Sequence, residues 1–179
     1  MYATLLQSDE PALVIECLNG YRLKEQMPQN IGQYTVPMGI PEVLREGNDL
    51  TVVTYGSMCR IVMDAAAELA EIGLSLEVID VQTLLPFDRH HYILTSIQKT
   101  HRVLFADEDM PGGASAYMMQ EVLDKQGAFS WLDSPARCLA ARPHRPAYSS
   151  DGDYFSKPNV ENVVDTVYEM MRESDPSSF

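Results

Sequence analysis

Three adjacent carboxylates, Asp107, Glu108 and Asp109, are the residues of this sequence whose types could most readily hold a metal ion. They follow an apolar run, at the edge where open α/β sheets gather their ligands, and Mg²⁺ takes oxygen ligands. Neighbouring side chains rarely converge on one ion, however, and no further carboxylate has a predictable place beside them. We therefore interpret the trio as a solvated acidic loop and expect no metal site.

Glycines and histidines that could do chemistry also favour structural roles. Gly112-Gly113 precedes a predicted helix but lacks both phosphate-loop fingerprints, and the carboxylates upstream would repel a phosphate. His90 and His91 project about 100° apart on a helix, so they cannot easily ligate one metal. We expect neither these glycines nor these histidines to form a catalytic or cofactor-binding site.

The only basic concentration in the sequence is a proline-rich loop that contains Arg142, His144, Arg145 and Tyr148. Arginine forks bind carboxylates and other anions in a bidentate manner, so the loop is a candidate anion-binding site. The same forks could instead hold the loop to nearby carboxylates of the protein. The residues alone leave both interpretations open.

A second acidic pattern, Asp151-Gly152-Asp153 followed by Asn159, superficially resembles two metal-binding motifs. It lacks the glycine at position six and the glutamate at position twelve of a calcium loop. Its spacing is also too short for the motif that holds magnesium and thiamine diphosphate. The segment favours a turn before a helix.

A regular α/β pattern that could position these residues begins at Asp49. Apolar and β-branched runs predict strands, and apolar residues at helical spacing predict the helices between them. The strands are expected at 50–54, 76–80, 103–106 and 137–141, and the helices at 58–72, 89–98, 115–125 and 159–172. Ser57 is the expected N-cap of the first helix and Gly73 its C-cap. This alternation predicts a three-layer α/β fold, an open and mostly parallel sheet with an antiparallel edge strand.

The first 48 residues differ from this pattern. One apolar run, Ala12–Cys17, predicts a strand, and many glycines and prolines follow it. A lone strand needs a sheet to satisfy its backbone. We interpret the segment as the tail of a preceding domain rather than as an edge strand of the main one.

Composition narrows the range of partners. The chain of 179 residues carries 26 acidic against 13 basic side chains, a net charge of −13. The electrostatic field of such a charge repels nucleic acid and anionic membranes and favours a basic partner. Three widely spaced cysteines predict no disulfide framework, and residues 1–20 contain no signal region, so we expect a cytoplasmic location.

Two runs of the sequence carry a resemblance to a known family. One is GIPEVLREGNDLTVVTYGS at 39–57 and the other is VIDVQTLLPFD at 78–88. With their neighbours they resemble the C-terminal part of the β subunit of thiamine-diphosphate-dependent 2-oxoacid dehydrogenases. The resemblance implies that residues 49–179 form a transketolase C-terminal-type domain. It also implies that residues 1–48 are the tail of the pyrimidine-binding domain plus a linker.

The resemblance places the chemistry of the parent enzyme outside this chain. Thiamine diphosphate and magnesium would bind to the α and pyrimidine-binding parts, so the chain alone is expected to be non-catalytic and to bind no cofactor. Its implied roles are contact with a second β copy and docking of the basic peripheral-subunit-binding domain of a dihydrolipoyl acyltransferase. Asp133 stands where related sequences place an acidic residue of that docking surface.

Two other functions stay open. A transketolase-like parent shares the domain but transfers a two-carbon unit and needs no lipoyl partner. A regulatory domain that binds a small anion through the loop of Arg142 and Tyr148 is an alternative of another class. The substrate is also open between pyruvate, a branched-chain 2-oxoacid and acetoin.

Overall fold

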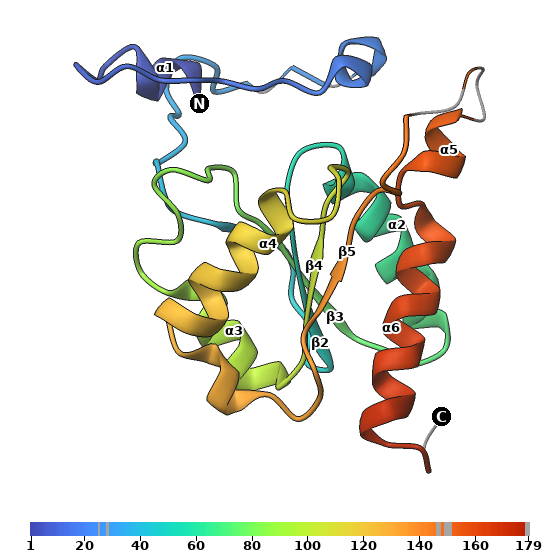
Figure 1. Ribbon diagram of the computed structural model, residues 1–179. Helices are drawn as coiled ribbons and strands as arrows, with labels where there is room; N and C mark the ends of the chain where they lie inside the picture. The colour runs from blue at the N-terminus through green and yellow to red at the C-terminus, as the bar shows by residue number, and fades with distance from the viewer. Residues whose placement is uncertain (25, 28, 146–147, 149–151, 178–179) are drawn as a thin grey trace.

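The strands predicted after residue 49 pair into one sheet in a computed structural model that describes residues 1–24, 26–27, 29–145, 148 and 152–177 (Figure 1). The strands are β1 Glu42–Arg45, β2 Leu50–Thr54, β3 Leu76–Asp80, β4 Val103–Ala106 and β5 Arg137–Leu139. The α-helices are α1 Tyr2–Leu5, α2 Met58–Glu71, α3 Tyr92–Thr100, α4 Ala114–Met119, α5 Gly152–Ser156 and α6 Val160–Ser174. Shorter helical turns are η1 Leu18–Arg22, η2 Gln120–Lys125, which is a π-helix, and η3 Ala128–Trp131.

The described strands lie in the order β1-β3-β2-β4-β5. Strand β2 pairs in parallel with β3 and β4, and β4 pairs in parallel with β5, whereas β1 runs antiparallel to β3. The predicted fold class, a mostly parallel sheet with an antiparallel edge strand, is confirmed. That edge strand precedes residue 49, in the segment interpreted as a linker, so the division of the chain at residues 48 and 49 stays a prediction.

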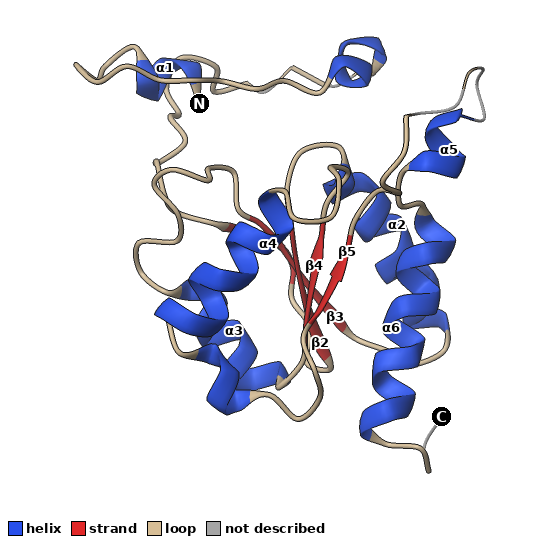
Figure 2. Ribbon diagram, in the orientation of Figure 1, coloured by secondary structure: helices blue, strands red, loops and turns tan. Residues whose placement is uncertain are grey.

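Helices cover both faces of the sheet (Figure 2). Alternate residues of each strand face opposite ways, so Val52 and Val78 pack with α2 and α6 on one face. Val53 and Ile79 pack with α3, α4 and η2 on the other. Strand residues buried on both faces explain why the sequence shows continuous apolar runs rather than alternation.

The first helix of the α/β pattern begins where the sequence predicts, and the second does not. Ser57 is the N-cap residue of α2, although its buried hydroxyl forms no hydrogen bond to the described residues. Helix α3 begins at Tyr92 rather than at Arg89. The buried Asp88 carboxylate accepts the N–H groups of Tyr92 and Ile93, at 2.9 and 3.0 Å, and so fixes that start.

The strand predicted at Ala12–Cys17 is absent from the described structure, which shows an extended, exposed segment there. Leu13 and Ile15 are 88% and 85% exposed. The physical reason is that none of the described residues forms a partner strand for this run, so its backbone cannot form a ladder. In Figure 1 the N-terminal segment lies beyond the upper ends of β4 and β5, outside the three layers.

None of the described helices has the length and apolar character needed to cross a lipid bilayer.

Candidate functional site at the carboxyl edge of the sheet

Parallel strands β2, β4 and β5 end at the same edge of the sheet, and the carboxylate of Asp107 lies between their ends. Asp107 is fully buried. It accepts the hydroxyl of Tyr55 at 2.6 Å and the backbone N–H groups of Asp109 and Ser115 at 3.0 Å each. Because Asp107 fixes the turn between β4 and α4, the interpretation of the whole trio as a solvated loop is wrong for this residue.

The other two carboxylates of the trio point to different partners. The Glu108 carboxylate accepts a hydrogen bond from Lys157 Nζ at 3.1 Å. Asp109 is exposed, and its carboxylate accepts the backbone N–H of Met110. The trio does not fit a magnesium diphosphate, because two of its three carboxylates are already bonded to other segments of the protein. Among the described residues, no three His, Cys, Asp or Glu side chains are grouped to hold a metal ion.

Two ionisable groups beside the trio have shifted pKa values. Burial, the hydrogen bond to Asp107 and the charges of the trio all raise the pKa of Tyr55, which therefore acts as a donor. Burial alone would lower the pKa of Lys157, but the hydrogen bond and charge of Glu108 outweigh it and raise the pKa. Lys157 therefore stays positively charged and joins α5 to the turn after β4.

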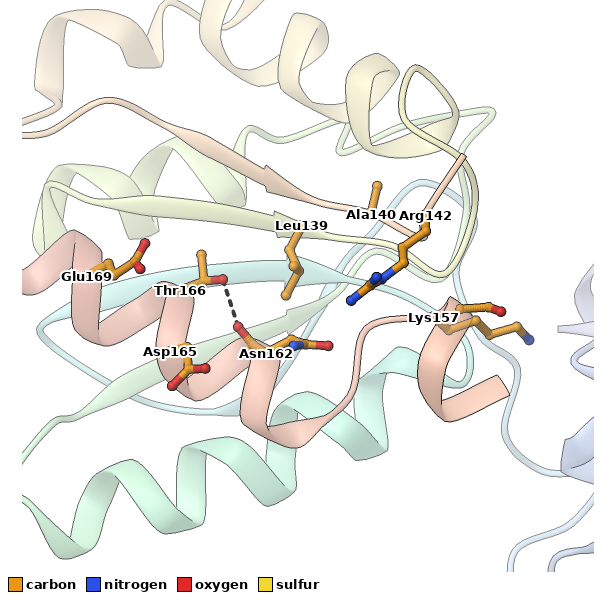
Figure 3. Close-up of a pocket in the computed structure, with 9 residues that line it drawn as sticks. Leu139, Ala140, Arg142, Lys157, Asn162, Asp165, Thr166 and Glu169 are labelled. Carbon is orange, nitrogen blue, oxygen red and sulfur yellow. Dashed lines mark hydrogen bonds between the residues drawn. The ribbon is translucent and has the colours of Figure 1, made fainter. Parts of the chain in front are cut away.

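A pocket of about 240 Å³ lies next to this ion pair, between the end of β5, the end of α5 and one face of α6. Its walls include Leu139 and Ala140 after β5, Arg142, and the α6 residues Asn162, Asp165 and Glu169. Figure 3 shows the Arg142 guanidinium pointing into this space, between Leu139 and Asn162. The amino group of Lys157 points the other way.

The structure brings together only part of the predicted anion-binding loop. Arg142 lies over the ring of Phe155, at 4.4 Å from its centroid, and His144 lies against the same ring at 5.7 Å. Arg145 is exposed and Tyr148 is 89% exposed, and neither lines the pocket. Residues 146–147 and 151, which belong to the predicted loop and to the acidic turn after it, lie outside the described residues.

The predicted partner-binding residue, Asp133, does not line this pocket and lies in the connection from η3 to β5, before the amino end of β5. It is exposed, and its N–H donates to the His101 carbonyl at 2.9 Å. The His101 Nδ1 in turn contacts the Trp131 carbonyl at 2.9 Å. Phe129 and Trp131 are 74% and 45% exposed. We call Phe129, Trp131 and Asp133 the aromatic–acidic face.

Sequence reasoning missed Asn162 and Lys157 as neighbours of Arg142. A signal existed, because the Lys157-Pro158-Asn159 run was interpreted as the turn before a helix, and Asn159 does cap α6. The first turn of that helix therefore had to lie near the end of the basic loop. Sequence alone gave no distance between that turn and β5.

Comparison with known proteins gives a family match for residues 39–161, to the family described as "Transketolase, C-terminal domain". Among curated relatives, the acetoin:2,6-dichlorophenolindophenol oxidoreductase β subunit of Bacillus subtilis is 31% identical over 94% of this chain and 48% of its own length. The pyruvate dehydrogenase E1 component β subunit of Mesostigma viride is 32% identical over 93% of this chain and 50% of its own. The chain thus spans about half the length of these relatives.

Solved structures support the fold alone. A split-gene transketolase, described as an inactive β4 tetramer, matches 78% of this chain and 44% of its own length, with a TM-score of 0.61 and 24% identity. A 2-oxoglutarate:ferredoxin oxidoreductase from Magnetococcus marinus matches 79% of this chain and 21% of its own, with a TM-score of 0.52 and 15% identity.

Proposed function

Because this chain belongs to the transketolase C-terminal domain family, we propose that it is the C-terminal assembly and partner-docking part of the first, decarboxylating component of a 2-oxoacid dehydrogenase complex. The observation that carries the proposal is the similarity, over more than nine-tenths of the chain, to a pyruvate dehydrogenase E1 β subunit and an acetoin oxidoreductase β subunit. The substrate class of the parent is a 2-oxoacid, pyruvate or a branched-chain one, and the acyl product passes to lipoyl groups.

In this proposal the reaction takes place outside the chain. Thiamine diphosphate and magnesium would bind to the α and pyrimidine-binding parts of the parent enzyme, outside this chain. The bonding of Asp107 and Glu108 to other parts of the protein supports this assignment, because it leaves these carboxylates poorly placed for a metal. Residues 49–179 then serve assembly, including contact with a second β copy.

Residues 1–48 are, in the same proposal, the tail of the pyrimidine-binding domain plus a linker. Exposed apolar side chains along this segment support it, since a neighbouring domain would remove them from water. They include Leu6, Leu13, Ile15, Leu18 and Ile31, each at least 69% exposed.

The aromatic–acidic face is the docking surface that we propose for the basic peripheral-subunit-binding domain of the acyltransferase. Exposed aromatic rings accept arginine or lysine by cation–π contact, and Asp133, two residues after Trp131, supplies an exposed carboxylate in the same connection. The net charge of −13 favours the approach of a basic partner. Aromatic anchors with a charged neighbour are typical of binding hot spots.

The test is a titration of the chain with that docking domain at low and high salt. We expect binding that weakens as salt screens charges over about 8–10 Å, and that is lost in Asp133→Lys. The matched control is Glu68→Lys, which makes the same charge change on an exposed position of α2, on the other face of the sheet. Absence of binding by the folded chain would favour a transketolase-like parent instead.

A further inference from the structure

Arg142 is an exposed cation that lines the pocket after the end of β5. Among the described residues it forms no ion pair, whereas Lys99, Lys125, Arg137 and Lys157 each pair with a carboxylate. Its position is nevertheless fixed, because its guanidinium lies on the Phe155 ring and its backbone N–H donates to the Ser156 carbonyl at 2.9 Å. A preorganised guanidinium without a carboxylate partner is suited to an external anion.

The α6 side of the pocket offers a second donor. The Asn162 Oδ1 accepts the Asn159 N–H at 3.3 Å within the capping box, so the amide group is oriented and its Nδ2 has no partner among the described residues. In Figure 3 this side chain extends toward the Arg142 guanidinium. Asn162 also lies in the first turn of a 15-residue helix, where the helix dipole favours negative charge.

The remaining walls limit what the anion can be. Leu139 and Ala140 offer an apolar surface beside Arg142. Further along α6, Asp165 lines the pocket and repels a second negative charge, whereas Glu169, which also lines it, pairs with Arg137 at 2.9 Å. The volume of about 240 Å³ is below the roughly 300–1,000 Å³ of sites for drug-sized ligands, so the ligand is small.

We infer that this pocket binds a small monocarboxylate, with its carboxylate held by Arg142 and Asn162 Nδ2 and its short apolar part against Leu139 and Ala140. The site is separate from the aromatic–acidic face and does not depend on the proposed function. Of the four residues in the predicted anion-binding loop, Arg142 alone carries it.

The test is a titration of the complete chain with propionate, followed by NMR of the Asn162 side-chain amide and the Arg142 Nε–H, against sodium chloride of equal ionic strength. We expect saturable shifts of both signals. Inorganic phosphate and succinate are expected to bind more weakly than propionate, because each carries more negative charge, which Asp165 opposes. No saturable shift, or tighter binding of phosphate or succinate, would overturn the inference.

Two variants locate the binding. Arg142→Gln removes the guanidinium, and Asn162→Asp keeps the capping oxygen while it replaces the donor with a negative charge. Each is expected to weaken propionate binding by about tenfold or more, as loss of a charge-assisted hydrogen bond implies. Arg145→Gln, which removes the same charge from the same loop but away from the pocket, should bind as the unaltered chain does. Unchanged affinity in Arg142→Gln would contradict the assignment.

Discussion

Two buried aspartates, Asp88 and Asp107, each hold the start of a helix in the connection that follows a strand. Asp88 accepts the N–H groups of Tyr92 and Ile93, and Asp107 accepts the N–H of Ser115 in the first turn of α4. Both are at most 2% exposed. The first N–H groups of a helix have no acceptor within the helix, and at the scale of single residues these carboxylates supply one. Their role is therefore structural.

Asp88→Ala should destabilise the fold by about 1–3 kcal/mol, because two buried N–H groups lose their acceptor. Asp88→Asn keeps one acceptor oxygen and should lose less. Urea unfolding of the chain and both variants measures the difference. Asp124→Ala, at an exposed position of η2, is the control and should change the free energy of unfolding little. Equal stability of Asp88→Ala and Asp124→Ala would contradict the capping role.

At the scale of elements, a buried polar network fastens α3 to the sheet. The carboxylate of Glu77 on β3 accepts the Ser96 hydroxyl, the Lys99 ammonium and, at 3.3 Å, the Gly47 N–H. The hydroxyl of Thr51 on β2 forms a hydrogen bond with the Ser96 hydroxyl at 2.7 Å. Gly47 is required here, because a Cβ at this position would overlap the backbone of the neighbouring strand.

The network makes stability depend on pH. Burial alone would raise the pKa of Glu77, but Lys99, Ser96 and the Gly47 N–H outweigh burial and hold the pKa below its ordinary value. The folded state therefore binds fewer protons than the unfolded state. The stabilisation is complete above the ordinary pKa of about 4.3 and is lost as pH falls through the lower folded value.

Glu77→Gln should therefore be less stable than the unaltered chain at pH 6, by a margin that narrows below about pH 4.3. Denaturant unfolding between pH 3 and pH 6 measures the margin. Glu68→Gln, on the exposed face of α2, should show no such narrowing. A margin that stays constant over this range would contradict the linkage.

The connection that carries the aromatic–acidic face depends on His101, which ends α3 in the left-handed conformation with φ 57°. A carbonyl only accepts hydrogen bonds, so the His101 Nδ1 must donate to the Trp131 carbonyl. Its own carbonyl accepts the Asp133 N–H. One residue thus holds the connection at two points.

His101→Ala should release this connection, so acrylamide should quench Trp131 fluorescence more strongly. Trp131 is the only tryptophan of the chain, so the signal reports on this segment alone. His101→Asn is the matched variant, because asparagine tolerates φ > 0 and its amide can donate. It should show less quenching than the alanine variant. Identical quenching in all three proteins would mean that His101 does not hold the segment.

At the scale of the whole molecule, the N-terminal segment and the α/β layers are joined by few contacts. The Cys17 thiol lies 3.9 Å from a Glu108 carboxylate oxygen. From Gly39 onward the chain is tied to the sheet, because the Gly39 N–H donates to Thr83 Oγ1 at 2.9 Å and β1 pairs with β3. Stability should therefore change sharply between these two parts of the chain.

A chain of residues 38–179 should unfold within a few degrees of the complete chain and bind less of a hydrophobic dye. A chain of residues 49–179 should melt several degrees lower, because it lacks β1, the Gly39 bond to Thr83 and the Gly47 bond to Glu77. Thermal unfolding of the three chains measures both effects. If residues 49–179 alone were as stable as the complete chain, β1 would contribute nothing to the sheet.

Local sequence pattern predicted four of the five described strands and the helices between them, but it missed β1 and predicted a strand at 12–17 that the described structure lacks. Continuous β-branched runs placed β2, β3 and β4 to the residue, because strands buried on both faces admit few polar side chains. Gly73, with φ 87°, follows the end of α2, and Asn159 caps α6, because these local conformations favour those residue types. The fold class followed from this alternation.

Only the tertiary structure decided which polar residues are buried and which meet. Asp107 and Asp109 look alike in the sequence, yet one is enclosed by Tyr55 and the turn after β4 while the other is exposed. Arg142 and Asn162 are twenty positions apart and share a pocket because α6 packs back along β5. Local pattern fixes local conformation, but burial and proximity depend on which distant segments cover a residue, and that is settled only when the layers pack.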